Sequence, residues 1–198
     1  MISVGYMFKR VSEKPAWLKT GDVVDVYSVG GCVSKEFADY FKYWKHNGYY
    51  LFDSPEIMEN LAKAENIDLS GTTLFYYEVY EYEFDNDSNE WVAFAPEKSF
   101  VTNVQVPIDK QLQGFDVVNF STGNGPECSP LSCNSLATTI PVNKHCLFNT
   151  FEEAQNAIER GLFENSEPGP YRIFAVYTLA SGAKNHSTGT AQAHACRV

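Results

Sequence analysis

The feature that most constrains the fold of this 198-residue chain is an internal repetition of residues 22–82 in residues 116–179. From Cys32 and Cys128 onward the two segments align without a gap at an offset of 96 residues. The matched positions are Asn47 with Asn143, Leu51-Phe52 with Leu147-Phe148, Glu56 with Glu152 and Asn60 with Asn156, and one more loop residue brings Val79-Tyr80 onto Val176-Tyr177. A repeat of this length is one supersecondary unit, which buries its apolar side against a neighbouring copy.

Each copy is predicted to begin with a strand and then a helix. The β-branched runs at residues 22–28 and 116–121 end at glycine-bearing loops, as strands do. Ser34 and Ser129 then stand where helix N-caps are expected, and Pro130 suits a first helical position. Apolar residues recur at helical spacing, at Phe37, Tyr40, Phe41 and Trp44 in the first copy and at Cys133, Leu136, Ala137 and Ile140 in the second.

A second helix and a closing strand complete each predicted unit. The second helices follow Ser54-Pro55 in the first copy and Thr150 in the second, where Thr150 and Glu153 have the spacing of a capping box. Closing strands are predicted over residues 74–84 and 171–179. Further strands are expected at 2–8, as an edge strand, at 91–94 and at 100–106.

Two strand-helix-helix-strand units in tandem predict an α+β fold, with helices packed on one face of a mixed or antiparallel sheet. A ferredoxin-like arrangement is one candidate. The predicted organisation is a first repeat with an N-terminal edge strand (1–84), a connecting hairpin and strands (85–114), a second repeat (115–180) and a flexible tail (181–198).

The net charge of −10 comes from one stretch of the chain. Residues 53–90 hold eleven acidic residues against one basic residue, and the remainder of the chain is balanced. A phosphate backbone is repelled by such a field, so nucleic acid is not an expected partner. A basic protein partner or a small ligand remains possible, and a solvated acidic surface that keeps the protein soluble is the simpler interpretation.

The expected location is the cytoplasm. The N-terminus lacks the pattern of a secretory signal, and no apolar run is long enough to cross a bilayer, so a membrane partner is not expected. Five cysteines without such a signal favour reduced thiols over a disulfide framework.

Cys32 and Cys128 are the main chemical candidates, because each lies between a glycine-bearing loop and a predicted helix start. A helix N-terminus favours the thiolate form, which suits a nucleophile or redox residue. The structural alternative is that Cys128 packs against Cys133 as a hydrophobic staple at that helix start. A catalytic pair needs a base, and the candidate is His145 beside Cys128, although its counterpart in the first copy is Tyr49.

Other residues suit binding rather than chemistry. Asp22 and Asp116 could form a carboxylate pair across a pseudo-twofold axis, or be solvated strand ends. The loop around Asn124, between two glycines, follows a strand and precedes a helix, as phosphate-binding loops do, but it lacks a phosphate fingerprint.

No cofactor or metal site is predicted. The one group with a metal-like composition is Cys128, Cys133, His145 and Cys146. Its spacing is not that of a zinc knuckle, and the adjacent His145 and Cys146 would point to opposite sides of an extended segment.

The segment Glu127-Cys128-Ser129-Pro130-Leu131-Ser132-Cys133-Asn134, together with His145-Cys146-Leu147-Phe148 and Glu167-Pro168-Gly169-Pro170-Tyr171-Arg172-Ile173-Phe174, resembles a group of uncharacterised bacterial proteins. The similarity covers the second copy and implies a bacterial, cytosolic origin, with no activity to carry over. The function expected from the sequence is therefore non-enzymatic binding or regulation, through the cleft between the copies or the acidic surface. The alternative is a cysteine-dependent enzyme centred on Cys128.

Overall fold

The computed structural model describes residues 1–14, 16, 18–19, 22–30, 47–94, 103–119 and 128–179. In these ranges its elements are β1 (Ile2–Arg10), β2 (Ser12–Glu13), β3 (Asp25–Val26), α1 (Pro55–Glu65), β4 (Thr72–Val79), β5 (Tyr82–Asp85), β6 (Glu90–Ala93), β7 (Lys110–Asn119), α2 (Pro130–Cys133), a 3-10 turn at Leu136–Thr138, α3 (Phe151–Glu159) and β8 (Tyr171–Leu179). The predicted helix over 34–44 lies outside the described residues.

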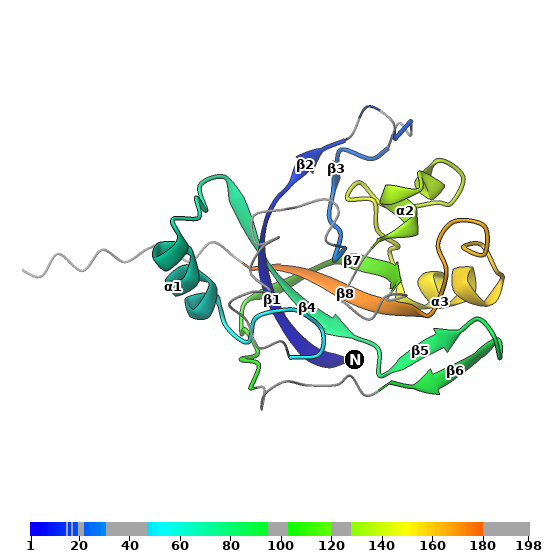
Figure 1. Ribbon diagram of the computed structural model, residues 1–198. Helices are drawn as coiled ribbons and strands as arrows, with labels where there is room; N and C mark the ends of the chain where they lie inside the picture. Colours follow the sequence, from blue (N-terminus) through cyan, green and yellow to red (C-terminus); the bar gives the residue numbers. More distant parts are fainter. Residues whose placement is uncertain are drawn as a thin grey trace, which may run out of the picture.

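The fold is α+β and is built on an antiparallel sheet (Figure 1). Its central strand is β8, which pairs with β7 along one edge and with β4 and β5 along the other, while β1 extends the sheet beyond β4 and β6 beyond β5. In a ferredoxin-like sheet the two strands that flank a helix are parallel and are separated by another strand, whereas here β1 and β4, which flank α1, and β7 and β8, which flank α3, are antiparallel neighbours. The sheet therefore does not have the ferredoxin-like arrangement.

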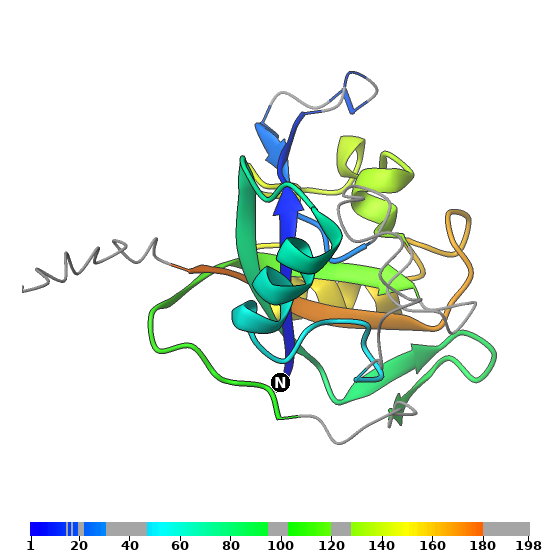
Figure 2. The same ribbon diagram turned by 60° about the vertical axis from the view of Figure 1, so that its left-hand side comes forward.

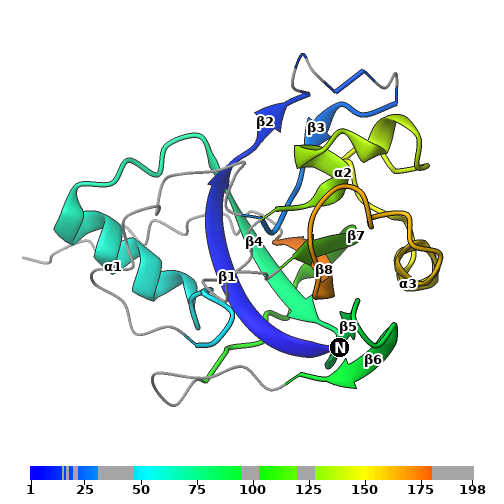
Figure 3. The ribbon, with the colours of Figure 1, turned by 45° about the vertical axis from the view of Figure 1, so that its right-hand side comes forward.

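The helices lie at opposite ends of the sheet (Figure 3). Helix α1 lies against β1, as Figure 2 shows, and α3 lies against β7 and β8. Each helix covers its own apolar cluster: Met58 of α1 packs in a cluster with Phe52 and Tyr76, and Ile158 of α3 packs in a second cluster with Leu131 and Phe163.

The structure confirms several predicted boundaries. β8 has the predicted limits, β1 is an edge strand paired with β4, and α1 begins at Pro55 after Ser54. Thr150 and Glu153 form the predicted capping box: the Glu153 N–H donates to Thr150 Oγ1 over 3.1 Å, and Glu153 Oε2 accepts from the Thr150 N–H.

Three predicted elements are shorter or interrupted. In the segment predicted as a strand over 22–28 only β3 is extended in a ladder, and its partner is β2 rather than the main sheet. The predicted strand over 74–84 breaks between β4 and β5, because β5 turns to pair with β6. The predicted helix after Ser129 ends at Cys133, since Ser135 takes a left-handed conformation with φ of 59°.

Strands β1 and β7 share an unusual local geometry. Each has a register shift next to a glycine with positive φ, Gly5 at 129° and Gly114 at 149°. A Cβ atom at Gly5 would lie 2.5 Å from the carbonyl oxygen of Phe52, and one at Gly114 would lie 2.6 Å from that of Phe148. At both edges the absence of a side chain lets a short segment pass close to the strand and bridge to it.

Asn47 and Asn143 organise these two short segments in the same way. The Asn47 side-chain amide donates to the carbonyl of Val4 over 2.8 Å, and that of Asn143 donates to Gln113 over 2.8 Å. Each side-chain oxygen then accepts from the N–H groups two and four residues later, which belong to Tyr49 and Leu51 in one case and to His145 and Leu147 in the other. The matched asparagines of the sequence therefore hold turns against strand edges.

Candidate functional site

A buried carboxylate, Asp116 on β7, lies where the two halves of the chain meet. Its Oδ2 accepts from Ser28 Oγ over 3.0 Å and from the Val29 N–H over 2.9 Å, and its Oδ1 accepts from Ser129 Oγ over 2.6 Å. Burial raises the pKa of Asp116 to about 6, and the bonds from Ser129, Val29 and Ser28, together with the charge of Lys9, limit that rise.

Lys9 on β1 is the cation of this centre and is itself buried, with 6% of its surface exposed. Its ammonium donates to the backbone carbonyls of Ser28, Val29 and Gly30 over 2.7, 2.8 and 2.9 Å. Segment 28–30 is therefore hydrogen-bonded on two sides. The Lys9 ammonium donates to its carbonyl oxygens, and the Asp116 carboxylate accepts from the Ser28 hydroxyl and the Val29 N–H. We refer to Lys9, Ser28, Asp116 and Ser129 as the polar centre.

The polar centre joins the entrances to the two cysteine-bearing loops of the sequence. Gly30 is the last described residue before the first loop, and Cys128 is the first described residue after the second. The Asn119 N–H donates to the Cys128 carbonyl over 3.1 Å, and the Cys128 N–H donates to Asn119 Oδ1 over 2.8 Å. In Figure 1 the end of β3, the end of β7 and α2 come together at this point. Of the predicted site residues in these loops, Cys32 and Asn124 lie outside the described residues.

Ser129 is the predicted N-cap of α2, but its hydroxyl does not cap the helix. The hydroxyl turns to Asp116 instead. The start of α2 is therefore fixed to the sheet, because the hydrogen bond from the Ser129 hydroxyl to the Asp116 carboxylate is charge-assisted.

Two further buried polar groups border the polar centre. Cys146 is 1% exposed, and burial followed by the charge of Asp116 raises the pKa of its thiol to about 12. Burial, with a smaller effect of Asp116, also raises the pKa of the Tyr77 hydroxyl well above its usual value. That hydroxyl is fully buried and has no hydrogen-bond partner among the residues that the structure describes.

His145 is oriented by an acidic partner that sequence reasoning did not identify. Its Nδ1 lies 2.5 Å from Asp25 Oδ1, and its ring stacks on Tyr27 with centroids 4.1 Å apart and planes 15° apart. The Tyr27 N–H donates to the His145 carbonyl over 3.0 Å. A carboxylate at Nδ1 leaves Nε2 as the nitrogen that can exchange a proton with another molecule.

The predicted residues therefore converge in part. Ser28, next to Tyr27, and Ser129, next to Cys128, both bond to Asp116, so the surroundings of Cys128 and His145 are linked through one carboxylate. Asp22 is exposed whereas Asp116 is fully buried, so the two do not form the carboxylate pair that the sequence suggested.

The cysteines differ from the sequence expectation. Cys128 and Cys146 carry thiols, but Cys133 is disulfide-bonded. The expectation of reduced thiols is therefore wrong for Cys133. Within the described residues no group of histidine, cysteine and acidic side chains is arranged to hold a metal ion, and no helix there is long and apolar enough to cross a membrane.

Sequence reasoning missed Lys9, Asp25, Tyr27 and Tyr77 as parts of this region. Lys9 and Tyr77 lie in apolar strands, and the neighbouring residues do not indicate that the Lys9 ammonium and the Tyr77 hydroxyl are buried. A weak signal for Asp25 exists in the sequence, because Asp25 lies in segment 22–28, which matches the strand bearing Asp116.

Comparisons of the chain with protein families, with curated proteins and with solved structures found no match.

Proposed function

We propose that this protein is a non-enzymatic binding or regulatory protein, which holds a small ligand or a partner segment beside the polar centre. The observation that carries the proposal is the convergence of Ser28, Val29 and Ser129 on Asp116. Backbone segments that buried hydrogen bonds fix to a sheet are a usual setting for a binding site. The buried charges are used to hold backbone, which suits support of a site better than direct chemistry.

The state of the thiols favours binding over cysteine chemistry. A thiol whose pKa is about 12, as at Cys146, is not a thiolate near neutral pH, and a disulfide-bonded Cys133 is not a nucleophile. Cys128, which is half-buried, is the thiol that remains for a catalytic role among the described residues.

Alkylation kinetics of Cys128 separate the two functions. For a binding protein we expect the rate with iodoacetamide to follow an ordinary thiol, so that it is half-maximal near pH 8.5 and continues to rise above that pH. Ligands that stabilise the protein in a thermal-shift screen should slow this reaction, because they cover the loop entrance. Cys146 serves as the internal control and should react only after unfolding. Rapid alkylation of Cys128 that is already maximal at pH 6 would contradict the proposal and favour an enzyme.

An acid-base enzyme is the second candidate, favoured by one observation: Asp25 fixes the His145 ring through Nδ1. In this hypothesis Nε2 takes the proton from the Cys128 thiol or from water. If ester or thioester substrates are turned over, we expect His145→Gln to lower kcat about 100-fold or more. Asp25→Asn should also lower it, whereas Asp22→Asn, the same change at an exposed position of the same segment, should not. Turnover that is unchanged in both His145→Gln and Asp25→Asn excludes this candidate.

The two halves are, we infer, a tandem duplication with a different starting point from the one that the sequence suggests. Support comes from the shared geometry of Gly5 and Gly114 and of Asn47 and Asn143. It also comes from the register of β4 and β8: in this part of the chain the copies are offset by 97 residues, and Glu78 pairs with its own counterpart, Ala175. In this interpretation β1 is the counterpart of β7, so the first copy begins near residue 2.

The partner and the compartment are also proposals. A basic partner is supported by the net charge of −10. The acidic stretch is only partly available to such a partner, because Asp53 is buried and Glu78 and Glu83 pair with Lys110 and Arg172. The predicted cytoplasmic location is weakened by the disulfide at Cys133, since disulfides persist mainly in oxidising compartments.

A further inference from the structure

Four aromatic side chains form a half-exposed patch beside α3. Tyr80 packs edge to face with Trp91 and with Phe151, at centroid distances of 5.5 and 4.9 Å. Tyr82 packs against Tyr80 with centroids 5.2 Å apart and is 40% exposed, whereas the other three rings are half-buried. We refer to these four residues as the aromatic patch. Surface tyrosine and tryptophan are enriched among the side chains that carry the energy of protein binding.

The aromatic patch lies on the face of the sheet that α3 covers. Phe151, which begins α3, also contacts Phe115 of β7 with centroids 6.2 Å apart. Asp116 of the polar centre is the next residue of the same strand, and successive side chains of a strand point to opposite faces of a sheet. The aromatic patch and the polar centre are therefore on opposite faces, and a partner can bind to the one without covering the other.

A carboxylate is fixed in position at the edge of the aromatic patch. The Trp91 indole N–H donates to Glu159 Oε1 over 2.8 Å, and the Gln155 side-chain amide donates to the same oxygen over 2.9 Å. The second oxygen, Oε2, accepts no hydrogen bond within the part of the chain that the structure describes, and Glu159 is exposed. Glu159 Oε2 is therefore oriented beside an aromatic surface and open to a donor from another molecule.

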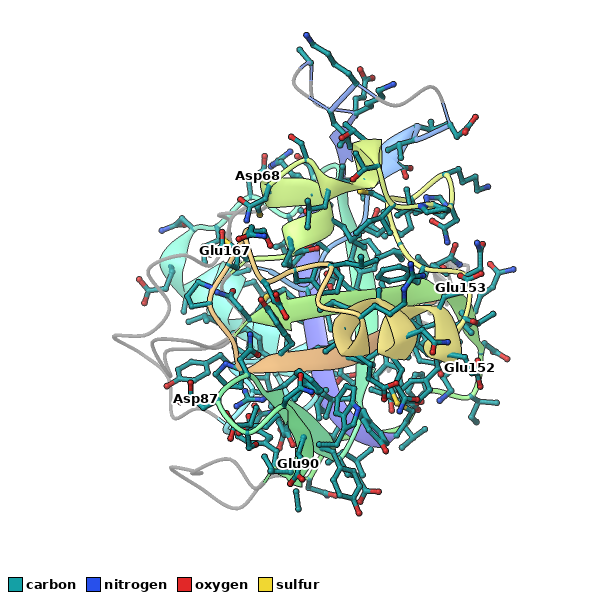
Figure 4. The ribbon with its side chains drawn as sticks, turned by 90° about the vertical axis from the view of Figure 1, so that its right-hand side faces the viewer. Asp68, Asp87, Glu90, Glu152, Glu153 and Glu167 are labelled. Carbon is teal, nitrogen blue, oxygen red and sulfur yellow. The ribbon has the colours of Figure 1, made fainter. Side chains whose placement is uncertain are left out.

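The charge beside the aromatic patch is negative. Within its bounds α3 carries Glu152, Glu153 and Glu159 and no basic residue, and Arg160 follows as its C-cap. Figure 4 shows Glu152 and Glu153 at the start of α3 and Glu90 lower in the view, where β6 begins. The net charge of the whole chain is −10. Such a surface attracts a cationic segment and repels an anionic one.

Arginine is the side chain that fits both parts of this surface. Its planar guanidinium stacks on tryptophan and tyrosine rings, and it pairs with a carboxylate through N–H groups of fixed geometry. A lysine ammonium is a point charge with a strongly held hydration shell, so it gains less from the rings. A neutral apolar partner would cover the rings but would leave the charge of Glu159 without a counterion.

We propose that the aromatic patch is a docking surface for an extended, arginine-bearing segment of another protein. An arginine of that segment stacks on the exposed rings and donates to Glu159 Oε2, while apolar side chains of the segment pack on the remainder of the patch. This inference rests on the basic partner proposed above and gives that partner a location. It does not depend on a ligand beside the polar centre.

Two peptides test the docking surface: acetyl-Pro-Arg-Pro-Pro-Arg-Pro-amide and the same peptide with citrulline in place of arginine. The prolines keep both peptides extended, and citrulline has the shape of arginine without its charge. The reporter is the Trp91 indole N–H signal in NMR spectra, identified by its loss in Trp91→Phe. At low ionic strength we expect the arginine peptide to bind about tenfold more tightly than the citrulline peptide, because it adds both an ion pair and a cation–π contact.

Matched variants assign this preference to the aromatic patch and its carboxylate. Glu159→Gln should weaken binding of the arginine peptide by about fivefold and leave the citrulline peptide unchanged. Tyr82→Leu keeps an apolar side chain but removes the ring, and it should weaken binding of the arginine peptide by about threefold. Glu59→Gln removes the same charge as Glu159→Gln from an exposed position of α1 and should change neither peptide.

The proposal is overturned if the two peptides bind equally, or if Glu59→Gln has as large an effect as Glu159→Gln. An arginine peptide whose affinity is unchanged in both Glu159→Gln and Tyr82→Leu would place the basic partner elsewhere and overturn this surface alone. Absence of binding by either peptide would contradict the basic partner as well. A Trp91 signal that shifts with protein concentration before any peptide is added would mean that a second copy of the chain covers the patch.

Discussion

Lys9→Met is expected to lower the free energy of unfolding by about 3–5 kcal/mol, the usual range for removing one partner of a buried ionic group. The ammonium of Lys9 is the donor to three backbone carbonyls in segment 28–30. Methionine has a similar length but donates nothing, so those oxygens would stay buried without that donor. The charge of Asp116 would also lose a buried cation that now lowers its pKa.

Urea unfolding at pH 7 measures this effect, and Lys63→Met is the matched control. Lys63 lies in the last turn of α1 and is exposed, so its replacement should change the free energy of unfolding by no more than about 0.5 kcal/mol. A Lys9→Met protein within about 1 kcal/mol of the unmodified chain would mean that water replaces the ammonium without loss, and that Lys9 does not hold the loop entrance.

The parts of the fold that local sequence determines were predictable. The capping box of α3 follows from Thr150 and Glu153, and the apolar run 173–177 within β8 matches a strand buried on both faces. The start of α1 follows from Pro55, whose ring suits the first turn of a helix. These signals act within a few residues, so they do not depend on what the rest of the chain does.

The errors arise where tertiary contacts override a local pattern. Residues 130–140 keep a helical apolar spacing, but Asn134 and Ser135 favour local alternatives to the helix, and Ser135 turns left-handed. The apolar run of β4 continues into β5, yet the backbone breaks there because β6 offers a second ladder. The β6 ladder is not visible in a short window around β4, whereas Asn134 and Ser135 are a local signal that the apolar spacing outweighed in the prediction.

The candidate site was the least predictable part, because its main residues come from distant strands. Asp116 was identified from the repeat and His145 from its place beside a cysteine, but their partners were not. Lys9 is more than a hundred residues from Asp116, and Asp25 is 120 residues from His145. Asp116 was expected to be a solvated carboxylate at a strand end. It is instead buried and accepts hydrogen bonds from Ser28 and Ser129.

The pH dependence of stability should reveal the buried carboxyl of Asp116. Its pKa is about 6 in the folded protein and 3.8 for the ordinary side chain, so between these values the folded state binds the extra proton. By proton linkage, the contribution of Asp116 to stability is complete below about pH 4 and is lost as the pH rises through 6. Two pKa units correspond to about 3 kcal/mol.

Asp116→Asn isolates this contribution from those of the other acids. Asparagine can still accept from Val29 and can donate to the Ser129 hydroxyl, but it cannot ionise. In urea unfolding from pH 4 to pH 7, the variant should therefore gain about 3 kcal/mol relative to the unmodified chain. Asp87→Asn, at an exposed turn, should show no such gain. If the Asp116→Asn curve runs parallel to that of the unmodified chain, Asp116 does not take up a proton in this range, and the polar centre holds a carboxylate that stays ionised throughout.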